Sequence, residues 1–194
     1  LYQARCKGAG IYIADFKGGV DYAGQFWRDL CNLVLDEDSL LECLSGLVDD
    51  LNVRKHMFLD AHCKNIDEYN RKNPTSLERI IFACDEVAEL LDKTGLGKEG
   101  RERVDKIIGY LSTIARQGRA FGIHLILATQ RPDANVIPGQ IKNNVMGRAC
   151  GASDNVLSQI ILDNTDAADL IPKETHGLFL LHDGTVFQGF WFSM

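Results

Sequence analysis

The segment RIIFACDEVAELL, residues 79–91, decides the fold prediction. Its apolar residues 80–84 are typical of a buried strand, and residues 87–91 begin a helical pattern. Between the two lie adjacent carboxylates, Asp85 and Glu86. A carboxylate at the end of an apolar run costs free energy unless a cation or a hydrogen-bond donor meets it. A magnesium ion that carries phosphates is one such cation, so this junction is the first candidate site.

Apolar runs and helical patterns alternate along the chain. Apolar side chains repeat every three or four residues from Ser39 onward, and again over about 101–119 and 153–162. Ser39 and Glu42 have the spacing of a capping box, which predicts a helix start there. Residues 177–192 read as two strands joined at the Asp-Gly dipeptide 183–184, which predicts a hairpin. We therefore predict an α/β fold, a mostly parallel sheet flanked by helices with the C-terminal hairpin at one edge.

Two other predicted strands also end on polar residues. The run 8–15 ends on Asp15, and the run 121–132 changes from apolar to polar at Thr129 and Gln130. Ligands bind at the carboxyl ends of the strands in an open parallel sheet, so these residues are expected beside Asp85 and Glu86. Each also has a plainer interpretation. Asp15 and Asp85 are common residues for a turn or a helix cap, and Thr129-Gln130 is compatible with a solvated strand end.

Composition narrows the function classes. The chain of 194 residues is 45% hydrophobic and carries a formal charge of -6, so it predicts one globular domain without a general basic surface for nucleic acid. Six cysteines occur without a CxxC pair, which indicates reduced thiols in a cytosolic protein rather than a disulfide framework. The sequence has no apolar run near the roughly 20 residues that span a bilayer.

Several segments resemble the motor domain of the FtsK/SpoIIIE family of DNA translocases. They are IIFACDEVAELL (80–91), ARQGRAFGIHLILATQRPDANVIPGQIKNN (115–144) and ILDNTDAADLI (161–171). Weaker similarity is carried by IYIADFKGG (11–19) and RKHMFLDAHCKNIDEYN (54–70). The resemblance runs from about residue 10 to residue 182, and its long middle segment is the most specific part.

The resemblance implies a RecA-like P-loop NTPase core that uses ATP with Mg²⁺, forms a hexameric ring and moves along double-stranded DNA. Asp85 and Glu86 match the Walker B pair, with Asp85 holding the hydrated metal and Glu86 polarising the attacking water. Gln130 matches the polar sensor at a strand exit, and Thr129 beside it is expected to contact the nucleotide. Arg119 matches the arginine that is offered to the ATP of a neighbouring subunit.

Arg119 has plainer interpretations and competitors. It is compatible with a solvated helix end or with a partner of the helix dipole. Arg116, Arg131 and Arg148 are alternative candidates for the same role.

The sequence also departs from the family pattern. No G-x-x-x-x-G-K-[ST] phosphate-binding motif occurs, and GLGKEG (95–100) has neither its spacing nor its hydroxyl residue, so Lys98 is not expected to bind phosphate. We therefore expect residues 1–194 to be a single partial RecA-like domain, truncated at its N-terminus and inactive alone. The charged loop 94–102 is open to two interpretations, a pore loop that contacts DNA or a solvated insertion.

The resemblance and the departures from it leave three functions open. The first is an ATP-driven DNA translocase for chromosome or conjugative DNA transfer, anchored to the membrane through segments outside this chain. The second is a protein-secretion ATPase of the type VII kind, with the same site and a peptide substrate. The third is a scaffold module without hydrolysis, against which the Asp85–Glu86 pair argues.

Overall fold

The computed structural model describes residues 1–16, 19, 22, 24–130 and 137–190. The chain divides into two compact units. The first contains residues 1–129 and 138–144, and the second contains residues 130–137 and 145–194. Whether the two units fold as the single predicted domain stays a prediction, and each unit is described by itself.

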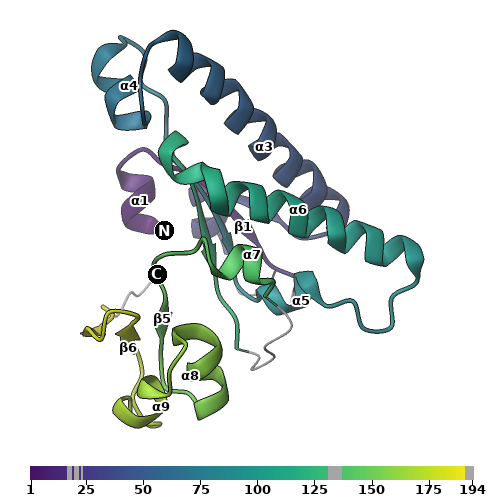
Figure 1. Cartoon of the computed structure of the whole chain (residues 1–194), viewed down its shortest axis with the longest axis vertical. Coiled ribbons are helices and arrows are strands. Elements are labelled where there is room, and N and C mark those ends of the chain that lie inside the picture. The colour runs from purple at the N-terminus through teal and green to yellow at the C-terminus, as the bar shows by residue number, and fades with distance from the viewer. Residues whose placement is uncertain (17–18, 20–21, 23, 131–136, 191–194) are drawn as a thin grey trace. The chain divides into compact units, whose positions relative to one another are not determined.

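A parallel sheet forms the centre of the first unit (Figure 1). Its strands lie in the order β2-β1-β3-β4. Their bounds are β1 (Gly10–Ala14), β2 (Asn32–Val34), β3 (Ile80–Cys84) and β4 (Ile123–Leu127). All three pairings are parallel, and Ala14, Cys84 and Leu127 lie side by side at the carboxyl ends. The predicted α/β class is confirmed.

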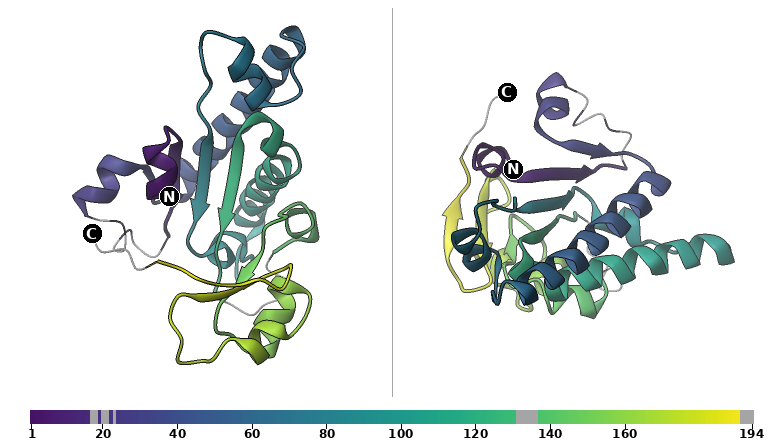
Figure 2. Two further views of the ribbon diagram at one scale, coloured as in Figure 1. Left: turned by 90° about the vertical axis from the view of Figure 1, so that its left-hand side faces the viewer. Right: turned by 90° about the horizontal axis from the view of Figure 1, so that it is seen from above.

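Helices cover both faces of this sheet (Figure 2). The long helices α3 (Glu37–Asp60) and α6 (Lys98–Phe121) pack side by side on one face. On the other face, Ile11 and Ile13 pack against α1 (Tyr2–Cys6) and α2 (Gln25–Leu30). Three short helices complete the unit: α4 (Ile66–Lys72), α5 (Val87–Leu91) and α7 (Gly139–Lys142).

Two element predictions differ from the structure in this unit. Helix α3 is capped by Asp36, whose carboxylate accepts the Ser39 amide at 2.8 Å, so the predicted capping box at Ser39 is wrong. An Asp outside the apolar stripe is as good a cap as the Ser inside it. Helix α6 begins at Lys98 rather than near residue 101, and it takes in part of the predicted loop 94–102.

The second unit has its own small antiparallel sheet and core. Strands β5 (Ala149–Cys150), β6 (Leu178–Leu181) and β7 (Val186–Gln188) lie in that order. Helices α8 (Asn155–Leu162) and α9 (Asp166–Leu170) pack beside them. The predicted hairpin forms, but β6 pairs with β5 rather than with an edge of the parallel sheet. Strand β5 is too short to give a periodic pattern in the sequence. The sequence therefore predicts the parallel sheet alone, and the hairpin was assigned to its edge.

All six cysteines are free thiols, as predicted. Burial raises the pKa of Cys84, at the end of β3, to about 12, so this thiol stays protonated and unreactive at neutral pH. Among the described residues, no helix is both long and apolar enough to cross a bilayer.

The turn from α6 into β4 depends on two glycines. Gly122 has φ +79°, the left-handed conformation that ends many helices. A Cβ on Gly118 would lie 2.3 Å from the backbone oxygen of Ile123. The helix end and the strand start therefore touch backbone to backbone.

We expect Gly118→Ala to destabilise the protein by about 1–3 kcal/mol, because backbone must move to admit the methyl group. Gly109→Ala in the same helix is the matched control, since Gly109 is exposed and no atom lies within 4 Å of its added Cβ. Helix propensity alone predicts that both changes stabilise by about 1 kcal/mol. Thermal unfolding of the two variants measures the difference, and a stabilised Gly118→Ala protein would contradict the packing.

Candidate functional site at the carboxyl edge of the sheet

The polar ends of three adjacent strands meet at the carboxyl edge of the parallel sheet. The amide of Asp85 donates to the carbonyl of Ala14 at 3.4 Å, and the amide of Ala128 donates to the carbonyl of Cys84 at 2.9 Å. Pairing thus continues beyond the strands, which sets Asp15, Asp85 and Ala128 next to one another in register, with Thr129 one residue further on, opposite Glu86. The backbone therefore brings Asp15, Asp85, Glu86 and Thr129 to the same edge of the sheet, as the sequence predicts.

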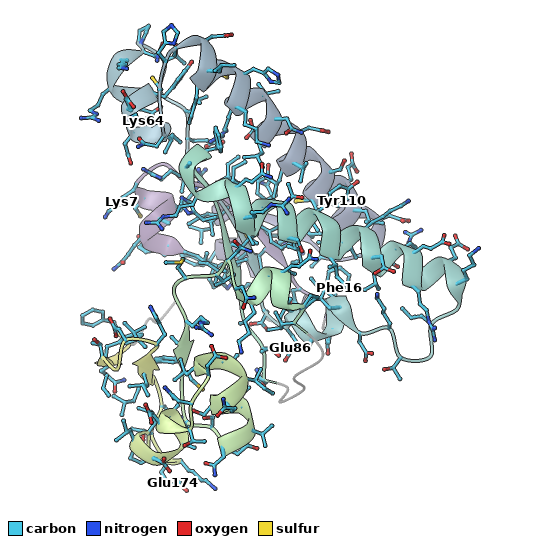
Figure 3. The ribbon with its side chains drawn as sticks, in the orientation of Figure 1. Lys7, Phe16, Lys64, Glu86, Tyr110 and Glu174 are labelled. Atoms are coloured by element: carbon cyan, nitrogen blue, oxygen red, sulfur yellow. The ribbon has the colours of Figure 1, made fainter. Side chains whose placement is uncertain are left out.

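Glu86 lies where β3 leads into α5, and Figure 3 labels it there. Glu86 is only 6% exposed. One carboxylate oxygen, Oε1, accepts the Thr129 hydroxyl at 2.6 Å and the Ala88 amide at 3.3 Å. Glu86 therefore caps α5 and is also tied to the neighbouring strand, so one hydrogen-bonding pattern fixes its orientation.

The carboxylates beside it suit a hard cation. Asp15 is 1% exposed, and Asp85 is half-buried. Mg²⁺ in nucleotide sites takes one or two carboxylates and fills its other positions with water and phosphate oxygens. Within the described ranges, no three His, Cys, Asp or Glu side chains converge closely enough to form a complete protein cage. The donor set fits a metal that arrives with its nucleotide.

Thr129 and Gln130 have different surroundings. The Thr129 hydroxyl is directed at Glu86, a partner that the sequence did not reveal. Gln130 is exposed and belongs to the second unit. The assigned roles of both residues toward a nucleotide stay predictions.

Arg119 lies at the opposite, amino edge of the sheet. It is exposed in the last turn of α6, just before β4 begins at Ile123. The rise of a parallel strand, about 3.3 Å per residue, puts roughly 20 Å between Ile123 and Thr129. An arginine side chain is much shorter than that. Arg119 therefore does not reach Glu86 of its own chain.

The competing arginines differ in their contacts. Arg148 donates to the Ile161 carbonyl at 3.1 Å and to Asp163 at 2.5 Å, so it is engaged within the second unit. Arg116 is exposed on α6, one turn before Arg119. Arg131 lies outside the described residues.

The amino edge also holds a cavity of about 470 Å³. Arg79 and His124 line it, and the two side chains approach to 3.5 Å at Nε2 of His124. Arg79 also forms an ion pair with Asp67 at 2.5 Å. Burial, with Arg79 and Arg119 nearby, lowers the pKa of His124, so its imidazole is neutral at pH 7. The cavity is separate from the carboxylate site at the other end of the strands.

Arg54 is the residue at this edge that sequence reasoning missed. It is 3% exposed on α3. The buried residues of that helix include Leu47, Leu51, Arg54 and Phe58, which follow one another at intervals of three or four positions. The sequence does contain a signal for this residue, a charged side chain on the apolar face of a helix. Such a side chain is buried only where hydrogen bonds or an opposite charge compensate it.

Comparison with known proteins places this geometry in a family. No protein-family model matches the chain. The DNA translocase FtsK of Campylobacter jejuni is 33% identical over 149 residues, which cover 74% of this chain and 15% of that protein. FtsK of Helicobacter pylori strain 26695 is 31% identical over 166 residues, covering 79% of this chain and 18% of the relative. The chain belongs to the FtsK/SpoIIIE family.

A solved structure extends the family match over nearly the whole chain. The pCW3 conjugation coupling protein TcpA, solved as a monomer form with ATPgS, is 44% identical with a TM-score of 0.89. The alignment covers 96% of this FtsK/SpoIIIE-family chain and 53% of TcpA. The type VII secretion ATPase EccC of Thermomonospora curvata is 19% identical with a TM-score of 0.67, a likeness of fold alone. The chain thus spans about half of TcpA and under a fifth of the FtsK relatives just described.

Proposed function

We propose that this domain is part of an ATP-driven motor that moves double-stranded DNA, with conjugative DNA transfer as its setting. The observation that carries the proposal is the buried Glu86, held by Thr129 next to Asp85 at the carboxyl edge of the sheet. The 44% identity to a conjugation coupling protein supports the setting. In this proposal the full-length protein is a homohexameric ring at the cytoplasmic face of a membrane, tethered through other segments.

Each residue of the edge has a distinct task in the proposed reaction. Glu86 accepts the proton of the attacking water, since a carboxylate fixed by two donors is aimed before the substrate arrives. Asp85 holds a Mg²⁺–ATP complex through water, and the metal, when bound, neutralises charge on the phosphates. Gln130 orients the water or senses the terminal phosphate. Arg119 stabilises charge on the nucleotide of an adjacent copy.

The test is hydrolysis of ATP by the full-length protein with and without duplex DNA. We expect turnover to rise several-fold when duplex DNA is added. Stimulation by a secretion-signal peptide and indifference to DNA would favour the secretion function instead. Absence of turnover under all conditions would contradict a motor of either kind.

Thr129 supplies a second test of the site. We expect Thr129→Val to lower kcat by about 10-fold or more, because loss of one hydrogen bond to a charged group costs about 1.5–3 kcal/mol. Thr129→Ser retains the hydroxyl and is expected to keep most of the activity. If Thr129→Val keeps wild-type kcat, or if Thr129→Ser alone loses activity, the hydroxyl is not needed and its contact with Glu86 has no catalytic role.

A further inference from the structure

The buried guanidinium of Arg54 bonds to the end of α6, the helix whose last turn contains Arg119. One nitrogen of Arg54, Nη1, donates to the carbonyl of Phe121 at 2.8 Å and to the carbonyl of Glu78 at 2.9 Å. Phe121 is the last residue of α6, and Glu78 precedes β3. Arg54 therefore joins three elements at one point: its own helix α3, the end of α6 and the entry to β3.

The charge of Arg54 is compensated locally. Its Nε lies 2.9 Å from Oδ2 of Asp50, one helical turn earlier, in an ion pair rather than a hydrogen bond. A buried ion pair contributes little net stability, and apolar side chains of similar volume often serve as well. Stability alone is therefore a weak reason for an arginine at this position.

The turn is bonded to β3 and closely packed against α4 and Arg54. The Ile80 amide donates to the Gly122 carbonyl at 2.8 Å, which ties the turn to β3. A Cβ on Gly122 would lie 2.4 Å from the Ile66 side chain and 3.4 Å from Nη1 of Arg54. Helix ends ordinarily fray, but this end is bonded on the α3 side by Arg54 and on the sheet side by Ile80.

Arg119 is the exposed residue that this arrangement holds in place. It lies in the last turn of α6, and its carbonyl accepts the Gly122 amide at 3.4 Å. A charge that acts on another molecule gains most when its backbone is already fixed, because a displacement of about 1 Å can cost 10²-fold in rate. The contacts of Arg54 supply that fixation.

We propose that Arg54 is a positioning residue for Arg119, which sets the reach of Arg119 toward the nucleotide of the adjacent copy. The inference rests on the proposed function. It adds a role for α3, a helix without any residue in the carboxylate site. Arg54 itself touches neither nucleotide nor Mg²⁺ in this proposal.

Arg54→Lys tests the inference in the full-length protein. The lysine keeps the positive charge but replaces the planar fork with a single ammonium group on a flexible stem. We expect DNA-stimulated kcat to fall about 10²-fold, while the affinity for a fluorescent ATP analogue stays at the wild-type value. A wild-type kcat in Arg54→Lys would overturn the inference.

Arg103→Lys is the matched control. Arg103 also joins α6 to α3, through Glu37 at 3.1 Å and Asp38, but at the end of α6 remote from Arg119. We expect this change to alter kcat by no more than about twofold, as for an exposed ion pair. An equal loss in both variants would mean that weakening any contact between α3 and α6 lowers kcat, which also overturns the specific role of Arg54.

Mixed rings separate positioning from damage to the variant's own site. A subunit with Arg54→Lys keeps its Glu86, and a subunit with Glu86→Gln keeps a well-placed Arg119. Mixing the two before ring assembly is expected to restore hydrolysis well above that of either variant alone. Arg119→Ala mixed with Glu86→Gln is the reference and is expected to behave in the same way.

The outcomes divide cleanly. Restoration in both mixtures supports the positioning role. If hydrolysis is restored only in the mixture that contains Arg119→Ala, Arg54 acts on the site of its own chain. The inference then falls, while the proposed motor stands. Restoration in neither mixture means that Arg119 does not act between copies, and the proposed arrangement and the inference fall together.

Discussion

Glu86→Gln is expected to abolish ATP hydrolysis by the full-length protein. The amide keeps the size of the carboxylate, and its oxygen can still accept from the Thr129 hydroxyl and the Ala88 amide. It cannot accept a proton from water. Removing a general base typically costs 10²–10⁴-fold in rate, so we expect kcat to fall by about that factor or more. Steady-state phosphate release in the presence of duplex DNA measures it.

The same variant is expected to bind ATP as the wild type does, because the loss lies in the chemical step. Glu89→Gln is the matched control: Glu89 lies one turn into α5, where its amide bonds to the Glu86 carbonyl at 3.2 Å. We expect its hydrolysis to stay within about twofold of the wild type. Wild-type turnover in Glu86→Gln would place the general base elsewhere.

The order of strands and helices around this site could be predicted because its signals are local. Five apolar residues followed by two carboxylates mark the end of β3 without any knowledge of its neighbours. The same holds for β1 and β4, whose apolar runs change to polar residues at the same edge. A buried parallel strand needs an apolar residue at nearly every position, so its end is legible in the sequence.

Elements without such runs were missed. Helix α2 and strand β2 lie between Gln25 and Val34, where the sequence shows neither a long apolar run nor a helical repeat. Strand β2 spans three residues and is stabilised by pairing with β1 rather than by its own pattern. The length of β5, two residues, explains in the same way why the hairpin was assigned to the wrong sheet.

Contacts between distant residues were beyond a single sequence. Thr129 is 43 positions from Glu86, and Phe121 is 67 positions from Arg54. Each contact depends on the register of strands that neither residue determines. Such pairs are where the structure adds to the site: it shows what holds Glu86, and what holds the turn behind Arg119.

Arg119→Ala is expected to lower DNA-stimulated kcat by about 10³–10⁵-fold, the range for an arginine that reaches a transferring phosphoryl group. Its own sheet puts Arg119 at the edge opposite Glu86, so the loss must arise at the nucleotide of another copy. We therefore expect the affinity of the variant for ATP to change far less than its turnover. Pre-steady-state hydrolysis with DNA bound measures the chemical step directly.

Arg116→Ala is the matched control for this prediction. Arg116 is exposed on the same helix, one turn away, and any general effect of lost positive charge at the end of α6 applies to it equally. A large loss in Arg119→Ala with little change in Arg116→Ala is expected, because a phosphoryl group is reached by one direction of approach only. If Arg116→Ala shows the greater loss, the two arginines exchange roles. If neither variant loses activity, the amino edge of this sheet has no part in the reaction, and Arg131 and Arg148 become the candidates for the same role.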